Sequence, residues 1–209
     1  YIPMTKLADQ GKINETLVEM IKANTRLPTD NEGDLYSLIA CNDVGCRRLL
    51  EMMDEFALDE LDTLADAICE NANAAVLAEI RKLPQGSWRS SMTIDGFESP
   101  IEYVAEMTIS ENGIHVDYDG TSSASRYGIN VPFGYTLAYT CFGISCVVSP
   151  HIPNNGGSLA PITASAPEGS ILNAAYPAPV SARHVIGQML PDVAFGCLAQ
   201  ALEGKVPAE

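Results

Sequence analysis

The strongest local constraint in this 209-residue sequence is the pair Asn112-Gly113, which separates two stretches of alternating apolar and polar residues. Asn-Gly favours a two-residue turn between antiparallel strands, because both residues tolerate positive φ angles. With this pair as the loop, Ile109 faces Val116 on the apolar side of a hairpin. His115 then lies on the polar side, where we expect it to be a solvent-facing strand residue.

Helical periodicity dominates the sequence before the hairpin. Apolar residues recur about every 3.6 positions in three stretches, 14–24, 34–56 and 59–83. Asn14 is suited to an N-cap, and Pro84 follows the third stretch as a stop signal. Because a short connection joins the second and third stretches, we expect them to form long antiparallel helices.

The period changes after residue 84, where alternating strand patterns and two strongly apolar helices follow. The helices are expected over 135–149 and, in one nearly continuous run, over 181–201. The sequence therefore predicts a mixed α+β fold with a helical part at 1–84 and an α+β part at 85–209. In the second part, antiparallel strands including the hairpin should pack with two buried helices.

The charge balance excludes two classes of partner. The formal net charge is −15, and the chain has only 12 Lys and Arg residues. A surface able to neutralise several nucleic-acid phosphates, or to bind an anionic membrane, needs more positive charge than this. A membrane span needs about 18 consecutive apolar residues, and no run of the sequence reaches that length.

The six cysteines do not form a recognisable metal motif. Cys41 and Cys46, like Cys141 and Cys146, have C-x4-C spacing, whereas zinc sites usually use shorter spacings together with histidines. We expect reduced, buried thiols in a cytoplasmic protein, with disulfides or metal binding as the lesser alternatives. The sequence also has no phosphate-binding loop, no G-x-S-x-G and no H-E-x-x-H motif.

The first candidate site is the polar stretch Asp119-Gly120-Thr121-Ser122, with Asn130 further along the chain. Asp-Gly directly after a strand is most often a simple turn. The functional alternative is a loop whose amides and hydroxyls hold a substrate or an anion. Both interpretations remain open from the sequence.

The second candidate site is Ser181-Ala182-Arg183-His184, at the start of the last predicted helix. Ser181 is suited to an N-cap, but a cation in the first turn is unfavourable because the helix dipole is positive there. An anionic partner would reverse the sign of that interaction. The partner is either a carboxylate of this acidic chain or a bound ligand, in which case Arg183 and His184 are candidate catalytic residues.

Long, collinear segments of the chain resemble the hydantoinase B/oxoprolinase family. They are NETLVEMIKANTRLP and GDLYSLIACNDVGCRRLLEMM near the start, then GINVPFGYTLAYT, HIPNNGG and PITASAPEGSILNAAYPAPVSARHVIGQMLPDV. The resemblance covers essentially the whole sequence.

This resemblance implies an ATP-dependent enzyme that opens cyclic amides such as hydantoins or 5-oxoproline. Relatives carboxylate acetone or acetophenone, which leaves a carboxylase subunit as an alternative. A hydantoinase A-type subunit or domain generally supplies the nucleotide-binding fold, so ATP would be bound by that partner. In mechanistic terms, Arg183 would act as an electrostatic clamp and His184 as a proton donor.

Family chains extend considerably beyond both ends of this sequence. Their His- and Asp-rich segment, associated with a divalent metal in the carboxylase branch, has no counterpart here. The resemblance therefore implies that the 209 residues are the middle of a longer protein and inactive alone. A third interpretation is a non-catalytic scaffold that packs against the partner, which the long amphipathic helices at 34–56 and 59–83 favour.

Overall fold

The computed structural model describes residues 2–203 and Val206, and its compact units divide between Asp62 and Thr63. We describe each unit by itself. The sequence prediction placed the division after residue 84 instead. The difference is the helix α3 (Asp62–Ile80), nearly all of which falls within the second unit. The predicted antiparallel pairing of the two long helices stays a prediction, because they belong to different units.

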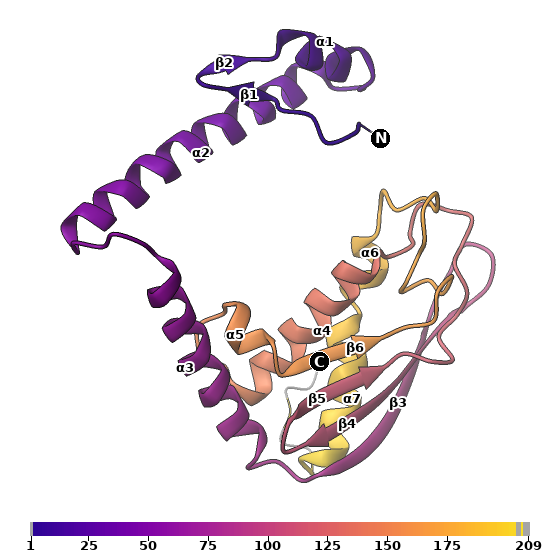
Figure 1. Cartoon of the computed structure of the whole chain (residues 1–209). Coiled ribbons are helices and arrows are strands. Elements are labelled where there is room, and N and C mark those ends of the chain that lie inside the picture. The colour runs from indigo at the N-terminus through magenta and orange to yellow at the C-terminus, as the bar shows by residue number, and fades with distance from the viewer. Residues whose placement is uncertain (1, 204–205, 207–209) are drawn as a thin grey trace. The chain divides into compact units, whose positions relative to one another are not determined.

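The first unit is built around a helical hairpin next to a two-stranded ribbon (Figure 1). Its elements are β1 (Ala8–Asp9), β2 (Lys12–Ile13), α1 (Glu15–Ala23) and α2 (Pro28–Glu55). Asn14 is the N-cap of α1, as predicted, and its side chain accepts a hydrogen bond from the Leu17 amide at 3.1 Å. Leu17 and Val18 are the buried residues of α1, which packs on α2.

Helix α2 begins six residues earlier than its apolar pattern indicated. Pro28 occupies its first turn, where a missing N–H has no cost because that donor has no helical partner. None of the 28 described residues of α2 is buried. Its predicted apolar stripe is therefore largely exposed within this chain, with Leu38 at 60% and Phe56 at 65% exposure.

The second unit is a four-stranded sheet packed against helices, with the strand order β3-β4-β5-β6. The strands are β3 (Gly86–Ile94), β4 (Ile101–Ser110), β5 (Gly113–Asp117) and β6 (Ile162–Ser165). The helices after α3 are α4 (Phe133–Val148), α5 (Gly156–Leu159), α6 (His184–Gly187) and α7 (Leu190–Ala201). The first three strands are antiparallel and β6 runs parallel to β5. The α+β class is confirmed.

The β4–β5 hairpin forms as predicted, but its register differs by two residues. Ile109 pairs with Ile114 rather than Val116, and Ser110 pairs with Gly113. A shift of two keeps every side chain on its face of the sheet, so the hydrophobic pattern could not detect it. Gly113 is needed here because β6 approaches closely, and an added Cβ would overlap the Pro161 carbonyl oxygen. His115 is exposed, as predicted.

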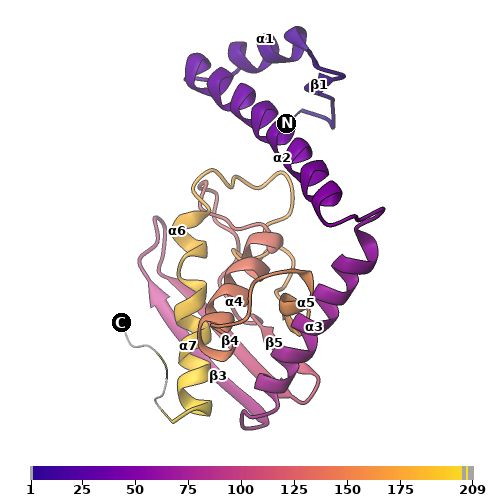
Figure 2. The same cartoon turned by 90° about the vertical axis from the view of Figure 1, so that its left-hand side faces the viewer.

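One face of the sheet carries the hydrophobic core. Helices α4 and α7 lie side by side against it, and α7 contacts both β3 and β4 (Figures 1 and 2). Fully buried side chains from the sheet and both helices meet there, including Met107, Val116, Ile144 and Leu198. Burying each such side chain contributes about 1.5–3 kcal/mol. Phe142 on the outer side of α4 is 56% exposed, so this helix is less buried than predicted.

The last helix is not continuous, which corrects the sequence prediction. It is divided into the four-residue α6 and the longer α7, with Pro191 in the first turn of α7. Pro191 cannot donate a hydrogen bond to the carbonyl four residues earlier, and its ring would collide with that carbonyl. The helix therefore restarts at Leu190. Ser181 does not cap α6, because the N-cap position belongs to Arg183.

All six cysteines are free thiols, as predicted, but they are not all buried. Cys141 and Cys197 are buried, whereas Cys41, Cys46 and Cys146 are exposed. Burial raises the pKa of the Cys197 thiol to about 11. Across the described residues, no helix combines the length and apolarity needed to cross a membrane, and no cluster of His, Cys, Asp and Glu could hold a metal ion.

Candidate functional site

Three loops of the second unit meet at one end of its sheet. They are the β3–β4 loop at 95–100, the β5–α4 loop at 118–132 and the β6–α6 loop at 166–183 (Figure 1). The sheet topology explains this, because β3, β5 and β6 all run opposite to β4 and so point towards the end of the sheet at which β4 begins. Every residue that the sequence singled out as a site candidate lies in these loops or at the start of α6. We call this region the loop end.

Thr121 is held by the edge of β4 and has a structural role. Its hydroxyl accepts a hydrogen bond from the Val104 amide at 3.0 Å and donates to the Val104 carbonyl at 3.2 Å. Ser122 continues the same pairing, since its hydroxyl accepts from the Glu102 amide at 2.9 Å. The Thr121 side chain is buried, with its donor used within the protein.

Asp119 and Gly120 form an exposed turn directly before Thr121. The Asp119 amide donates to the Asp117 carboxylate at 3.2 Å, and Gly120 has a φ of +92°, which favours glycine. No hydrogen bond or ion pair among residues 2–203 joins this turn to Arg183 or His184. The turn interpretation accounts for both residues, and their predicted contact with a ligand stays a prediction.

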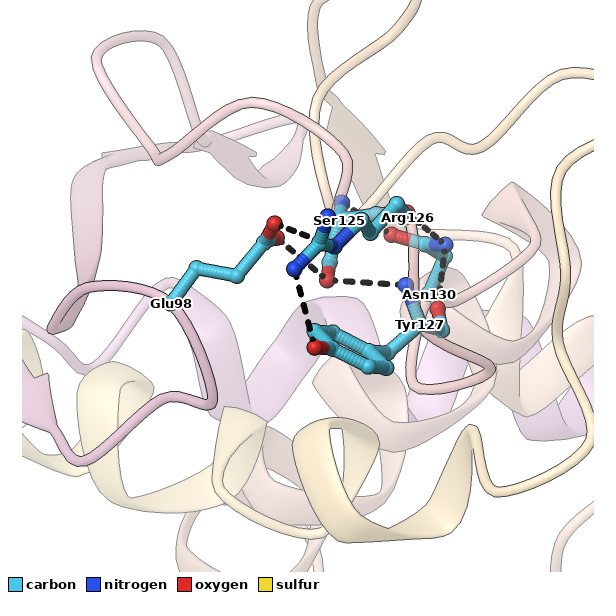
Figure 3. A network of polar contacts seen from close by, with 5 residues as sticks. All are labelled: Glu98, Ser125, Arg126, Tyr127 and Asn130. Carbon is cyan, nitrogen blue, oxygen red and sulfur yellow. Dashed lines mark hydrogen bonds and ion pairs between the residues drawn. The ribbon is translucent and has the colours of Figure 1, made fainter.

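Asn130 is fully buried, and its amide group is completely engaged (Figure 3). Its oxygen accepts from the Ser125 amide at 2.7 Å. Its nitrogen faces three carbonyl oxygens, those of Ser125 at 2.8 Å, Tyr127 at 3.0 Å and Pro179 at 2.9 Å. Because these bonds use both N–H groups, Asn130 connects the β5–α4 loop to the β6–α6 loop rather than facing an open space.

Arg183 and His184 are exposed at the beginning of α6. The Arg183 guanidinium donates to the Val180 carbonyl at 3.4 Å and lies 6.0 Å from the centre of the Tyr135 ring. That ring stacks on Tyr139 in the next turn of α4, with centroids 4.4 Å apart. Among the described residues Arg183 forms no ion pair with a carboxylate, so the structural alternative of an internal ion pair is not realised there.

The structure gives Arg183 different electrostatic surroundings from those that the sequence predicted. A four-residue helix has too small a dipole to oppose a cation strongly, so α6 itself gives little reason for a bound anion. The Tyr135 ring beneath the guanidinium explains instead why Arg183 lies where it does, because a cation is attracted to the face of an aromatic ring. Hydrogen bonding with Tyr139 is the largest cause that raises the pKa of Tyr135, and the Arg183 charge acts in the opposite direction.

A second network at the loop end was not foreseen. Glu98 forms an ion pair with Arg126 at 2.7 Å, and the Arg126 guanidinium donates to the Tyr127 hydroxyl at 3.1 Å (Figure 3). A hollow of about 250 Å³ lies beside it, lined by the 97–101 and 122–125 segments together with Ile129 and Ile171. Neither Glu98 nor Arg126 stood out in the sequence, because their pairing depends on contact between the β3–β4 loop and the β5–α4 loop.

The family model described as hydantoinase B/oxoprolinase matches residues 1–209. The chain belongs to the hydantoinase B/oxoprolinase family. The resemblance stated from the sequence is thereby confirmed.

The chain is also similar to a curated relative in sequence and to two solved structures in fold. A putative D-/L-hydantoinase subunit from a Pseudomonas species is 26% identical over 97% of this chain and 37% of its own. The ATP-dependent caprolactamase structure from Pseudomonas jessenii superposes with a TM-score of 0.86 at 24% identity, over 96% of this chain and 35% of that one. A nucleotide-free acetone carboxylase structure gives a TM-score of 0.73 at 14% identity, over 98% and 29%. The chain thus spans only about a third of the length of each of these three proteins.

Proposed function

We propose that this chain is part of a subunit of an ATP-dependent enzyme that opens cyclic amides such as hydantoins or 5-oxoproline. The observation that carries the proposal is the family match over residues 1–209. The names of a hydantoinase subunit and of an ATP-dependent caprolactamase among its relatives support it. Because the chain spans only part of those proteins, we expect these residues to be inactive alone.

The chemistry requires ATP because the nitrogen lone pair of an amide is delocalised into its carbonyl. Transfer of the γ-phosphoryl group to the carbonyl oxygen releases ADP and makes the carbon electrophilic. Water then adds to the carbon, the ring nitrogen leaves with a proton, and hydrolysis of the acyl phosphate gives the carboxylate. In this proposal a hydantoinase A-type subunit or domain binds ATP, and any divalent metal is held outside these 209 residues.

Within this proposal, Arg183 and His184 supply the charge and the proton. Arg183 is the electrostatic clamp for the oxygen that becomes anionic, held beside the Tyr135 ring at 6.0 Å. His184 is exposed, and a protonated imidazole can donate a proton to the leaving nitrogen. Asp119, Gly120 and Ser181 remain candidates for substrate contact because they too are exposed.

The experiment uses the full-length protein assembled with its partner subunit. ATP hydrolysis is measured with hydantoin, N-methylhydantoin and 5-oxoproline for the wild type, Arg183→Gln and His184→Ala. We expect one substrate to stimulate ATP hydrolysis, and each substitution to reduce that stimulation at least 100-fold without loss of assembly. His151→Ala is the matched control, since His151 is exposed beyond the far end of α4. Full stimulation in both site variants would support the scaffold interpretation instead.

The fold match to acetone carboxylase favours one second candidate, an ATP-dependent carboxylase subunit. Both functions consume ATP, but they differ in the other co-substrate. A carboxylase requires bicarbonate, whereas ring opening requires water. Repeating the assay with and without bicarbonate, and with acetone, separates them. Bicarbonate dependence would replace the hydrolase proposal with the carboxylase one.

We also propose a cytoplasmic location. The free state of all six cysteines supports it, since exposed thiols such as Cys41 and Cys46 persist in a reducing compartment. The dependence on ATP in the proposed reaction is consistent with the same compartment. Fractionation of cells that produce the tagged full-length protein tests this directly, and a membrane or periplasmic fraction would contradict it.

A further inference from the structure

The segment that ends at Arg183 has little hydrophobic anchorage of its own. Between Ala175 and Ser181, every residue except Ala178 and Val180 is exposed, and neither of those two is fully buried. A loop with so few apolar contacts is expected to open locally at low free energy unless hydrogen bonds hold it. The conformation in which Arg183 and His184 are presented therefore depends on a small number of polar contacts.

Two contacts tie this segment to the β5–α4 loop directly before Arg183. The Asn130 amide donates to the Pro179 carbonyl at 2.9 Å, although the two residues are 49 positions apart. The Ala182 amide donates to the Gly128 carbonyl at 2.6 Å. Gly128 also packs against Ser181 so closely that an added Cβ would overlap the serine hydroxyl.

The Asn130 end of this link is stiff. The same amide group bonds the Ser125 amide at 2.7 Å and the Ser125 carbonyl at 2.8 Å, which closes the β5–α4 loop on itself. Asn130 is 0% exposed, so water cannot replace these bonds without opening the loop. Removing the Asn130 side-chain amide would leave several backbone groups without a hydrogen-bond partner, including the carbonyls of Tyr127 and Pro179.

We propose that Asn130 is a positioning residue, which fixes the 179–182 backbone and so presents Arg183 and His184 at the loop end. It acts through the Pro179 carbonyl, and the Gly128–Ala182 hydrogen bond acts alongside it. This role differs from the substrate or anion contact expected of Asn130 from the sequence, because its polar atoms are already engaged. The catalytic consequence rests on the proposed function, whereas the structural link does not.

Hydrogen exchange measures the link without any substrate. The wild type, Asn130→Ala and Gly128→Val are compared in the full-length protein with its partner, following the peptide 178–184, which contains the Ala182 amide. We expect exchange of this peptide to become at least 10-fold faster in both variants, while peptides from α7 are unchanged. Gly128→Val keeps the Asn130 side chain and adds two methyl groups to a Cβ that would lie 3.6 Å from the Cβ and the backbone nitrogen of Ser181, so rotation of the serine hydroxyl alone cannot make room. This variant therefore decides the test even where Asn130→Ala does not fold.

Asn173→Ala is the matched control. Asn173 is a partly buried loop asparagine, and its amide donates to the Ala166 carbonyl at 2.8 Å within the β6–α6 loop. Its removal costs a comparable side-chain hydrogen bond without touching 179–182. We expect exchange of the peptide 178–184 to stay within two-fold of the wild type. Equal acceleration in the control, or no acceleration in Gly128→Val, would overturn the link.

Steady-state kinetics then test the catalytic consequence. Displacement of a clamp and a proton donor that act in the transition state should lower kcat for the cyclic amide at least five-fold and leave KM for ATP unchanged, while Asn173→Ala keeps the wild-type kcat. Each kcat is divided by the folded fraction of the enzyme, measured by circular dichroism, and a decrease that disappears after this division would refute positioning. If the wild type opens no cyclic amide, the proposed function fails, and hydrogen exchange still decides whether Asn130 holds the segment.

Discussion

A buried hydroxyl pair between the sheet and α4 gives the sharpest test of the second unit. The hydroxyls of Tyr118 and Thr140 lie 2.6 Å apart, and both residues are 0% exposed. The Thr140 hydroxyl donates to the Thr136 carbonyl at 2.7 Å. Its single hydrogen is thus used, so the Tyr118 hydroxyl must be the donor to Thr140. Removing either partner therefore has unequal consequences.

Thr140→Val removes two hydrogen bonds and leaves the Tyr118 hydroxyl as a buried donor without an acceptor. An unsatisfied buried group costs about 1–3 kcal/mol, so we expect a loss of about 2–3 kcal/mol of folding free energy. Tyr118→Phe removes one hydrogen bond and leaves no orphaned donor, so its cost should be about 1 kcal/mol. The double variant has no orphaned donor and should lose about 2 kcal/mol, which is less than the sum of the single losses.

Urea unfolding monitored by tryptophan fluorescence measures these differences. Trp88 is the only tryptophan in the sequence and lies in β3, so its signal reports the second unit. The three variants and the wild type form a double-mutant cycle with a coupling of about 1–2 kcal/mol. A Thr140→Val loss no larger than that of Tyr118→Phe, or strictly additive losses, would refute the assigned direction of the hydrogen bond.

The remaining predictions concern packing, pH and surface charge. Gly157→Ala should destabilise the second unit by about 1–3 kcal/mol in the same urea assay, because the added Cβ would overlap the Cys69 carbonyl. Burial raises the pKa of Cys197 to about 11, so the associated stability is fully present below pH 9 and is lost as the pH rises towards 11. Cys197→Ala should therefore weaken the fall in unfolding midpoint between pH 8 and pH 10.5. Glu98→Gln breaks an exposed ion pair with Arg126 and should change stability by less than about 1 kcal/mol by thermal denaturation.

The sequence was sufficient for features that depend on local patterns. Asn14 was identified as an N-cap, and the alternation around residues 101–117 placed each side chain on the correct face of the hairpin. The register was missed because a two-residue shift leaves that alternation unchanged. Gly113 was expected in the turn but lies in β5 against Pro161, the residue directly before β6, and that contact joins segments distant in the sequence.

The candidate site could be located from the sequence but not interpreted. Arg183 and Asn130 stood out as polar residues in apolar or loop surroundings, and the structure places both at the loop end. The role of Asn130 depends on Pro179, and the surroundings of Arg183 depend on Tyr135. Neither pair has a periodic signature, because each joins loops or elements far apart in the chain.

The proposed function couples ATP hydrolysis to the opening of a cyclic amide. The most direct measurement is the ratio of ADP formed to ring-opened product, for the full-length protein with its partner, in bicarbonate-free buffer. We expect ring opening to require ATP, and ADP and product to accumulate in a fixed ratio without bicarbonate. Ring opening without ATP, or ATP hydrolysis that no cyclic amide stimulates, would contradict it.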